Sequence, residues 1–253
     1  MRYIVTADTD IGISKNTNQD SVLVKHARTD SGEVVMAIVC DGMGGLAKGE
    51  LASATVIRAF DCWFREQLPY ELENIDFPVI GQKWSLMLKE LNAHILEHGK
   101  KTGASLGTTF SGILMYEGRY VIVHVGDSRV YRVSSSLEQL TTDQTFVARE
   151  IRKGTMTEAQ AKVDKRRNLL LQCVGASKNV EPEVLYGSVK EGAYMLCSDG
   201  FRHEISPDEI LGSLNPINLK NKETMHRNVR YLIELVKSRM ERDNISAILI
   251  KAE

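Results

Sequence analysis

Apolar residues recur along this chain with two different periods, and the change of period separates blocks of strands from blocks of helices. Alternating or continuous apolar runs predict strands at 2–6, 21–26, 33–40, 106–116, 119–125, 128–133, 137–140, 192–197 and 245–250. Helical spacing predicts helices at 47–68, 79–98 and 222–240, and capping signals at Thr157 and Ser206 predict shorter ones. Because strands and helices do not alternate one for one, the pattern favours antiparallel sheets covered by helices, an α+β fold.

Composition supports a single folded unit. Of the 253 residues 43% are hydrophobic, which is enough to bury a large core. No repeat, low-complexity tract or linker interrupts the chain, so we expect one domain over residues 1–253. The 32 Lys and Arg residues nearly balance the 33 Asp and Glu residues, which gives a formal net charge of −1. This balance argues against a nucleic-acid binder, whose affinity rests on a basic excess.

The sequence predicts neither a membrane span nor a secretory leader. The N-terminal MRYIVTADTD reaches acidic residues after one short apolar run, and no stretch approaches the roughly 18 apolar residues of a membrane-spanning helix. The four cysteines are scattered without a CxxC pair, and they are Cys40, Cys62, Cys173 and Cys197. Such cysteines are typical of reduced thiols, so we expect a cytoplasmic protein.

Several aspartates stand at the ends of apolar runs. Asp41, Asp127 and Asp199 each follow a predicted strand, and Asp243 lies between the last helix and the last strand. Each alone is also typical of a turn, and a set of unrelated turns remains one interpretation. Clustered carboxylates, however, repel one another unless a cation neutralises them. Ligands that are all oxygen select Mg²⁺, Mn²⁺ or Ca²⁺ rather than zinc.

Short motifs in a fixed order span essentially the whole chain. They are Asn18-Gln19-Asp20-Ser21, Asp41-Gly42-Met43-Gly44-Gly45, Gly107-Thr108-Thr109, Gly126-Asp127-Ser128-Arg129, Thr142-Asp143-Gln144, Ser198-Asp199-Gly200 and Asp243-Asn244-Ile245-Ser246. In this order the motifs resemble those of the metal-dependent PP2C-type (PPM) serine/threonine protein phosphatases, in their compact bacterial form. The resemblance implies two packed antiparallel β-sheets flanked by antiparallel helix pairs, an αββα sandwich.

The resemblance also implies an activity and its requirements. Phosphoserine and phosphothreonine in proteins would be hydrolysed by a water or hydroxide that bridges two metal ions, Mn²⁺ or Mg²⁺, with a third ion in bacterial members. Two such ions can activate the water and neutralise the phosphoryl oxygens, so no protein nucleophile is needed. The expected partners are phosphoproteins and a bacterial Ser/Thr kinase with its targets, and we expect a monomer.

The resemblance carries a metal-binding role over to six residues, which are Asp20, Asp41, Gly42, Asp127, Asp199 and Asp243. Asp41 would bridge two ions, with Asp199 and Asp243 completing the first site. The carbonyl of Gly42 would complete the second site, where Asp20 acts through bound water. Asp127 matches the residue that, with Asp199, holds the third and weaker ion.

Two regions depart from the family pattern. Lys15 stands where the family usually has a phosphate-binding arginine, and it offers charge to a phosphate without the planar fork of arginine. A solvated loop lysine is the alternative.

In the flap subdomain, residues 142–175, Asp164-Lys165 replaces the His-Pro pair that commonly precedes the family's Arg-Asn, so no general-acid histidine is carried over. Residues 141–170 hold seven Lys or Arg against four Asp or Glu, which indicates either a preference for acidic phosphoproteins or a solvated surface.

Other classes fit the sequence less well. A cysteine phosphatase needs an arginine six residues after its cysteine, and those positions here are Leu46, Leu68, Asn179 and His203. The Asp8-Thr9-Asp10 segment is similar to a haloacid-dehalogenase nucleophile motif, but Gly12 occupies the Thr/Val position. A non-catalytic relative that only binds phosphoproteins would be expected to lack metal carboxylates, and here they are present.

Overall fold

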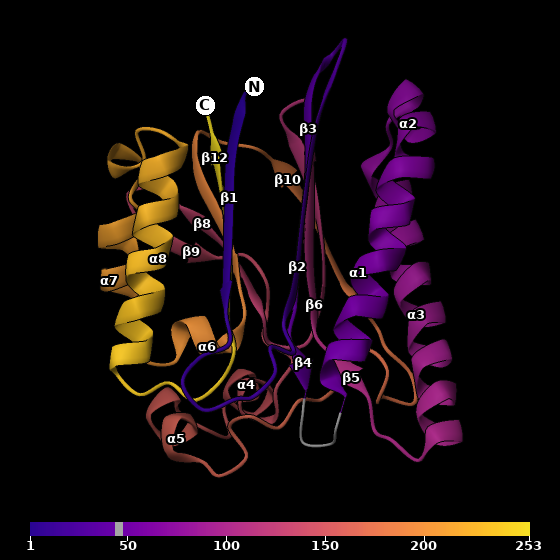
Figure 1. Cartoon of the computed structure of the whole chain (residues 1–253), viewed down its shortest axis with the longest axis vertical. Helices are drawn as coiled ribbons and strands as arrows, with labels where there is room; N and C mark the ends of the chain where they lie inside the picture. The colour runs from indigo at the N-terminus through magenta and orange to yellow at the C-terminus, as the bar shows by residue number, and fades with distance from the viewer. Residues whose placement is uncertain (44–47) are drawn as a thin grey trace.

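Two five-stranded antiparallel sheets lie face to face at the centre of the structure, a computed structural model that describes residues 1–43 and 48–253 (Figure 1). The first sheet has the order β1 (Tyr3–Asp10), β12 (Ile245–Ala252), β11 (Gly192–Cys197), β8 (Arg129–Val133) and β9 (Leu137–Gln139). The second has the order β10 (Glu183–Ser188), β7 (Arg119–Val125), β6 (Phe110–Tyr116), β3 (Gly32–Cys40) and β2 (Ser21–Thr29). A separate pair joins β4 (Gly42–Met43) to β5 (Gly107–Thr108).

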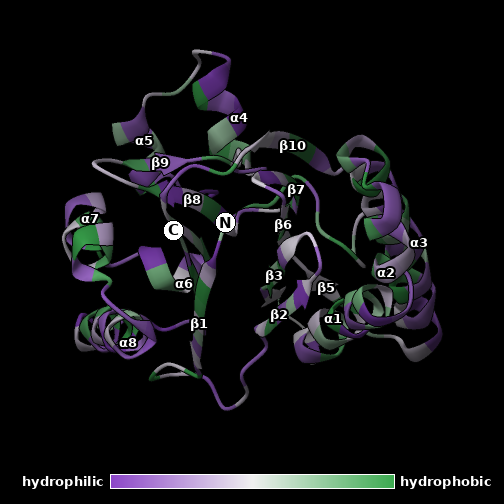
Figure 2. Ribbon diagram, turned by 90° about the horizontal axis from the view of Figure 1, so that it is seen from above, coloured by the Kyte–Doolittle hydropathy of each residue, from purple (hydrophilic) through white to green (hydrophobic). Residues whose placement is uncertain are grey.

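Helices cover the outer face of each sheet, as the view from above shows (Figure 2). The second sheet is covered by α1 (Gly49–Glu66) and α3 (Phe77–Thr102), with α2 (Leu68–Glu71) and η1 (Leu72–Asn74) between them. The first sheet is covered by α6 (Asp199–Arg202), α7 (Pro207–Leu214), η2 (Pro216–Asn218) and α8 (Lys222–Ser238). The short helices α4 (Phe146–Arg152) and α5 (Glu158–Val163) project from one end (Figures 1 and 2).

Side chains that alternate between the two faces of a strand explain how a central strand packs against the helices on one face and against the other sheet on the opposite face. In β3 the even-numbered residues from Val34 to Ile38 pack with α1 and α3, whereas the odd-numbered residues from Val35 to Val39 pack between the two sheets. Successive side chains of a strand point to opposite faces, so a strand buried on both faces must be apolar throughout. The continuous apolar run in the sequence therefore marks a strand at the centre of the sandwich.

The structure confirms the predicted fold class, two packed antiparallel sheets flanked by helices. The helix predicted at 47–68 runs over α1, and Ala47 lies outside the described residues, as do Gly44 and Gly45 of the Asp41 motif. The α3 helix is longer than predicted because Asp76 caps its start, accepting from the Val79 N–H at 3.2 Å, and a left-handed Gly103 ends it. Strand β10 was not predicted. No helix within residues 1–43 and 48–253 is both long and apolar enough to cross a membrane.

Candidate active site

Antiparallel pairing brings the acidic strand ends to one end of the sandwich, at the bottom of Figure 1. Asp20 immediately precedes β2 and Asp41 immediately follows β3, and these two strands pair along their whole length. Asp199 begins α6 just after β11, and Asp243 comes just before β12, the strand paired with β11. Asp127 lies in the short connection between β7 and β8. Each sheet therefore contributes carboxylates to the same edge.

These carboxylates lie close enough to oppose one another's ionisation. Burial raises the pKa of Asp41 well above its usual range, and the charges of Asp20, Asp199, Asp127 and Asp243 raise it further. Burial and the charge of Asp199 likewise raise the pKa of Asp20 to about 7 and that of Asp127 to about 7. Repulsion among buried carboxylates means that the end of the sandwich favours a bound positive charge.

The donor set suits a hard divalent cation. Oδ2 of Asp20 and Oδ1 of Asp199 are buried and accept no hydrogen bond from any described residue. A buried carboxylate oxygen without a partner is costly, and a cation bound there would remove the cost. As the side chains lie, no three His, Cys, Asp or Glu residues among those described form a complete ligand set. The residues fit a metal ion by their chemistry, burial and shared location.

Lys15 lies at the edge of this acidic centre. Its Nζ is 2.9 Å from Oδ1 of Asp243, and both side chains are partly exposed. Burial alone would lower the pKa of Lys15, but the hydrogen bond to Asp243 and the charges of Asp41 and Asp199 outweigh it and raise the pKa. The ammonium is therefore an ion-paired neighbour of the centre rather than an isolated loop residue.

Two glycines let the loops that carry the aspartates approach each other. A Cβ on Gly42 would lie 2.3 Å from the carbonyl oxygen of Gln19 and 2.6 Å from that of Gly49. A Cβ on Gly200 would lie 2.2 Å from the carbonyl oxygen of Asn244. Since real Cβ atoms do not come this close to backbone, only glycine permits the contact between these loops. This is the physical reason for glycine directly after both aspartates.

Threonine and asparagine side chains fix the same loops. The Asp41 N–H donates to Oγ1 of Thr109 at 2.9 Å, and the Thr108 hydroxyl donates to the Asp41 carbonyl at 3.0 Å. Asn244 accepts from the Gln19 N–H at 2.9 Å and donates to the carbonyl oxygens of Ile11 at 2.9 Å and of Thr17 at 3.2 Å. The Gly107-Thr108-Thr109 and Asp243-Asn244 motifs thus hold the backbone beside the carboxylates.

Sequence reasoning missed a His–Glu pair behind the centre. Nε2 of His203 lies 3.5 Å from Oδ2 of Asp199, and its Nδ1 lies 3.3 Å from Oε2 of Glu241. The carboxylate of Glu241 in turn accepts the backbone N–H groups of Arg242 at 2.7 Å and Asp243 at 2.9 Å. The pair joins the Asp199 and Asp243 loops. The i,i+4 spacing could have revealed the contact between Asp199 and His203, but no local signal points from His203 to Glu241.

An arginine network was missed as well. Arg129 makes a bidentate pair with Asp143 at 2.8 and 2.7 Å, and its Nη1 donates to the Tyr131 hydroxyl at 2.7 Å. Arg202 donates to the Asp127 carbonyl at 3.1 Å and lies 3.8 Å from Oδ2 of Asp143. These contacts connect the Asp127 loop to the first residues of the flap. No spacing in the sequence links positions so far apart.

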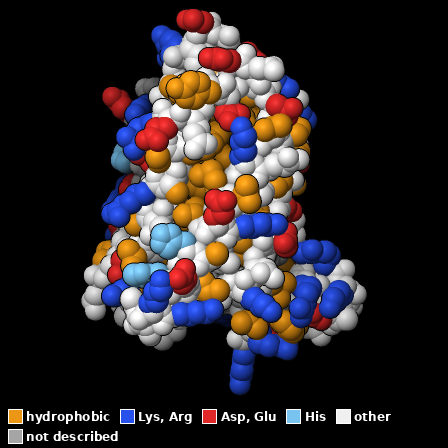
Figure 3. Space-filling view, turned by 90° about the vertical axis from the view of Figure 1, so that its right-hand side faces the viewer, with side chains coloured by type: hydrophobic (Ala, Val, Ile, Leu, Met, Phe, Trp, Pro, Cys, Tyr) orange, Lys and Arg blue, Asp and Glu red, His pale blue; other side chains and the backbone are white. Residues whose placement is uncertain are grey.

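The flap contains two short helices, α4 and α5, and most of its charged residues are Lys or Arg. Capping by Thr157 and Gln160 starts α5, as the sequence predicted. Inside the flap, Arg166 lies 4.1 Å and Arg149 lies 5.1 Å from the centroid of the Phe146 ring, a cation–π arrangement. Lys and Arg side chains gather where these helices project, at the lower right of Figure 3. The flap is thus a basic lobe at the same end as the carboxylates.

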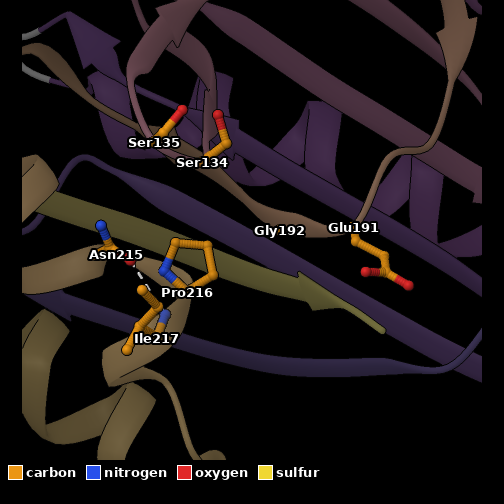
Figure 4. A pocket seen from close by; sticks show the side chains of 7 residues that line it. All are labelled: Ser134, Ser135, Glu191, Gly192, Asn215, Pro216 and Ile217. Atoms are coloured by element: carbon orange, nitrogen blue, oxygen red, sulfur yellow. Dashed lines mark hydrogen bonds between the residues drawn. The ribbon is translucent and has the colours of Figure 1, made fainter.

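A surface cavity of about 320 Å³ lies at the other end of the sandwich (Figure 4). It is bounded by Ser134 at the end of β8, Gly192 at the start of β11, and Pro216 in η2. The acidic residues lie at the opposite ends of these strands, because Asp127 precedes β8 and Asp199 follows β11. The cavity has no cluster of titratable groups and is no part of the candidate site.

An αββα sandwich whose two sheets bring carboxylates to one end belongs, by fold and site, to the metal-dependent phosphatases. The sequence model described as protein phosphatase 2C matches residues 13–249. The chain belongs to the protein phosphatase 2C family, and it is a protein serine/threonine phosphatase. This confirms the predicted family and class of enzyme, and it removes the cysteine-phosphatase and haloacid-dehalogenase alternatives.

Relatives and solved structures agree with this membership. The serine/threonine phosphatase stp of Listeria monocytogenes is 28% identical over 243 residues, which are 91% of this chain and 92% of that protein. The Streptococcus agalactiae serine/threonine phosphatase structure matches with a TM-score of 0.87 and 26% identity, over 100% of both chains. The catalytic domain of the phosphatase PstP, solved in complex with two manganese ions, matches with a TM-score of 0.77 and 27% identity, over 98% of this chain and 97% of that one.

Proposed function

We propose that this phosphatase binds two Mn²⁺ or Mg²⁺ ions at the end of the sandwich and hydrolyses phosphoserine and phosphothreonine in proteins there. Asp41, Asp199 and Asp243 would hold the first ion, and Asp41 and the Gly42 carbonyl would hold the second, with Asp20 acting through bound water. The observation that carries the proposal is the convergence of buried carboxylates from both sheets, with unpartnered oxygens on Asp20 and Asp199. Bound ions supply the positive charge that activates a water molecule and neutralises the phosphoryl group.

The chain's own residues hold this arrangement in place. Hydrogen bonds from Thr108 and to Thr109 fix the backbone of Asp41, and the carboxylate of Glu241 holds the N–H of Asp243. Lys15 lies within reach of a phosphate bound beside Asp243, and we assign it to substrate phosphate binding as a point charge. Preorganised groups of this kind act on the transition state without reorganising at the moment of reaction.

The flap supports a preference for acidic phosphoproteins. Four exposed cations, Arg152, Lys162, Lys165 and Arg167, have no ion pair with any described carboxylate, whereas the acidic residues Asp143, Glu150 and Asp164 are paired with arginines. The exposed cations would attract negative charge near the phosphorylated residue. The proposed substrates are targets of a bacterial Ser/Thr kinase, and the enzyme acts as a cytoplasmic monomer. The four unpaired thiols are in keeping with a reducing compartment.

Turnover of p-nitrophenyl phosphate with Mn²⁺, Mg²⁺ or EDTA tests the metal requirement, and phosphopeptides bearing pSer, pThr or pTyr then test the substrate. We expect activity with Mn²⁺ or Mg²⁺ and none in excess EDTA, because every proposed ligand is an oxygen. Peptides with acidic and with neutral flanks, compared at equal length, test the flap. Full activity in EDTA would contradict the metal centre, and equal rates on both peptides would contradict the role of the flap.

A further inference from the structure

The surroundings of Asp127 do not fit the third metal ion that the resemblance implies. That ion would need oxygens from Asp127 and from Asp199. We propose that the guanidinium of Arg202 supplies the positive charge beside Asp127 instead, so that this enzyme holds two ions per chain and leaves the third site closed. This inference rests on the two-ion centre proposed above.

Arg202 lies directly against Asp127. Its Nη2 donates to the Asp127 backbone carbonyl at 3.1 Å and is 3.7 Å from Oδ2 of the same residue, and the arginine side chain is only 14% exposed. An ion ligated by this carboxylate would lie about 2.0–2.6 Å from its oxygen, and so within roughly 6 Å of the guanidinium. Two cations at that range in a buried site repel each other. Arg202 therefore opposes binding of an ion at Asp127.

Asp199 offers one oxygen and not two. Its Oδ1 is buried without a partner among the described residues, as a ligand of the first ion should be. Its Oδ2 faces Nε2 of His203 at 3.5 Å, and the other ring nitrogen of His203 lies 3.3 Å from Glu241. A third ion would have to take Oδ2 from the histidine. This contact is independent of Arg202, and it closes the other side of the same site.

Asp127 and its neighbour Asp143 each face a guanidinium group. Asp143 is the neighbouring carboxylate, and Arg129 holds it in a bidentate pair. Arg202 lies between Asp127 and Asp143, 3.7 Å from the one and 3.8 Å from the other. Two carboxylates are thus matched by two guanidinium groups. Of the carboxylates near Asp127, Asp199 is then the one left to attract a divalent ion, and its Oδ2 faces His203.

Counting bound Mn²⁺ tests this inference without measuring activity. Equilibrium dialysis at millimolar Mn²⁺, with metal analysis, is expected to give two ions per chain for the parent enzyme and still two for Asp127→Asn. Arg202→Met removes the charge at similar side-chain length, and we expect it to bind a third ion roughly tenfold or more tightly than the parent does. Arg202→Lys keeps the charge and is expected to stay at two.

Arg239→Met serves as the matched control, because Arg239 is an exposed arginine paired with Glu209 on α7; two ions are expected. A parent enzyme that binds three ions and loses one in Asp127→Asn would overturn the inference. So would an Arg202→Met enzyme that folds, by its circular dichroism, and binds only two. If Arg202→Met does not fold, the numbers of Mn²⁺ ions bound by the parent and by Asp127→Asn decide whether the inference holds. Asp41→Asn separates the two proposals, since bound Mn²⁺ that does not depend on Asp41 would refute the two-ion centre itself.

Discussion

Replacing Asp20 by asparagine should stabilise the metal-free enzyme, although it removes a residue of the active site. Asp20 is only 8% exposed and its Oδ2 has no partner among the described residues. Burial and the charges of Asp199 and Asp243 raise its pKa from 3.8 to about 7, against the opposing hydroxyls of Ser246 and Ser198. Asparagine has nearly the same shape and no charge, so it removes the electrostatic cost while keeping the packing.

The size of the effect follows from the pKa shift. The carboxyl of the folded chain keeps its proton up to about pH 7, whereas that of the unfolded chain loses it near 3.8. The folded state therefore binds more protons between these values, and its stability falls as the pH rises through them. Each pKa unit is worth about 1.4 kcal/mol, so the cost is on the order of 4 kcal/mol at about pH 8 and 2 kcal/mol at about pH 5. For a chain of this length about 4 kcal/mol raises the melting temperature by roughly 10 °C.

Thermal unfolding in EDTA measures this difference directly. We expect Asp20→Asn to melt above the parent at both pH values, with the larger gain at the higher pH. Asp30→Asn, in the exposed turn between β2 and β3, is the control and should change the melting temperature little. With Mn²⁺ the order should reverse, because ions that bind only the folded state stabilise the parent more. An Asp20→Asn enzyme no more stable than the parent in EDTA, or one with the same gain at both pH values, would refute the reasoning.

Three further substitutions test other parts of the site. Lys15→Ala should lower kcat/KM on a phosphothreonine peptide by about tenfold to a hundredfold, because a charge-assisted hydrogen bond is worth roughly 1.5–3 kcal/mol, and Lys15→Arg should hold or raise it. Steady-state kinetics measure these changes, and a Lys15→Ala enzyme with unchanged kcat/KM would show that Lys15 does not bind the substrate phosphate and that the metal ions do. Asp199→Asn should lose nearly all turnover and bind less Mn²⁺ by calorimetry while its circular dichroism stays that of the parent; normal metal binding would contradict its assignment as a ligand. Arg129→Met should lower the free energy of unfolding in urea by about 1.5–3 kcal/mol, since it removes the bidentate partner of the largely buried Asp143, which keeps Gln139 and Arg202 as neighbours. Asp143→Leu in the same chain should restore part of the loss; equal stability of the single variant and the parent would argue against the ion pair.

Strands buried on both faces were the elements that the sequence predicted best. The apolar run of β3 has no other placement, because both of its faces need an apolar partner. Strand β10 was missed because it is a short edge strand, and its residues from Glu183 to Ser188 are exposed or only half-buried. Such a segment carries neither a continuous apolar run nor a strict alternation. Its position is set by pairing with β7, which is a tertiary contact.

The candidate site could be predicted where short motifs carry it and not where distant side chains meet. Asp41 and Asp199 could be predicted because each follows an apolar run and is itself followed by glycine. The close backbone contacts at Gly42 and Gly200 explain why glycine follows each aspartate. The contact between His203 and Glu241 joins positions 38 residues apart, from the C-cap of α6 to the loop before β12. Nothing local in the sequence requires it, so only the folded chain reveals it.

The acidic centre depends most directly on the packing between the two sheets. Asp41 leaves one sheet and Asp199 the other, so their separation is set by the side chains that fill the space between β3 and β11. Val39 and Leu196, which lie two or three residues before these aspartates, are both fully buried in that layer. Protein interiors are close-packed, so a change in volume of even one methylene group affects the packing of the neighbouring side chains. The layer between the sheets therefore positions the site, while α3, α7 and α8 act on it through the sheets that they cover. The α1 helix also contacts the site loops directly, because its Gly49 lies against Gly42 and its Ser53 hydroxyl donates to the Gln19 carbonyl at 2.7 Å.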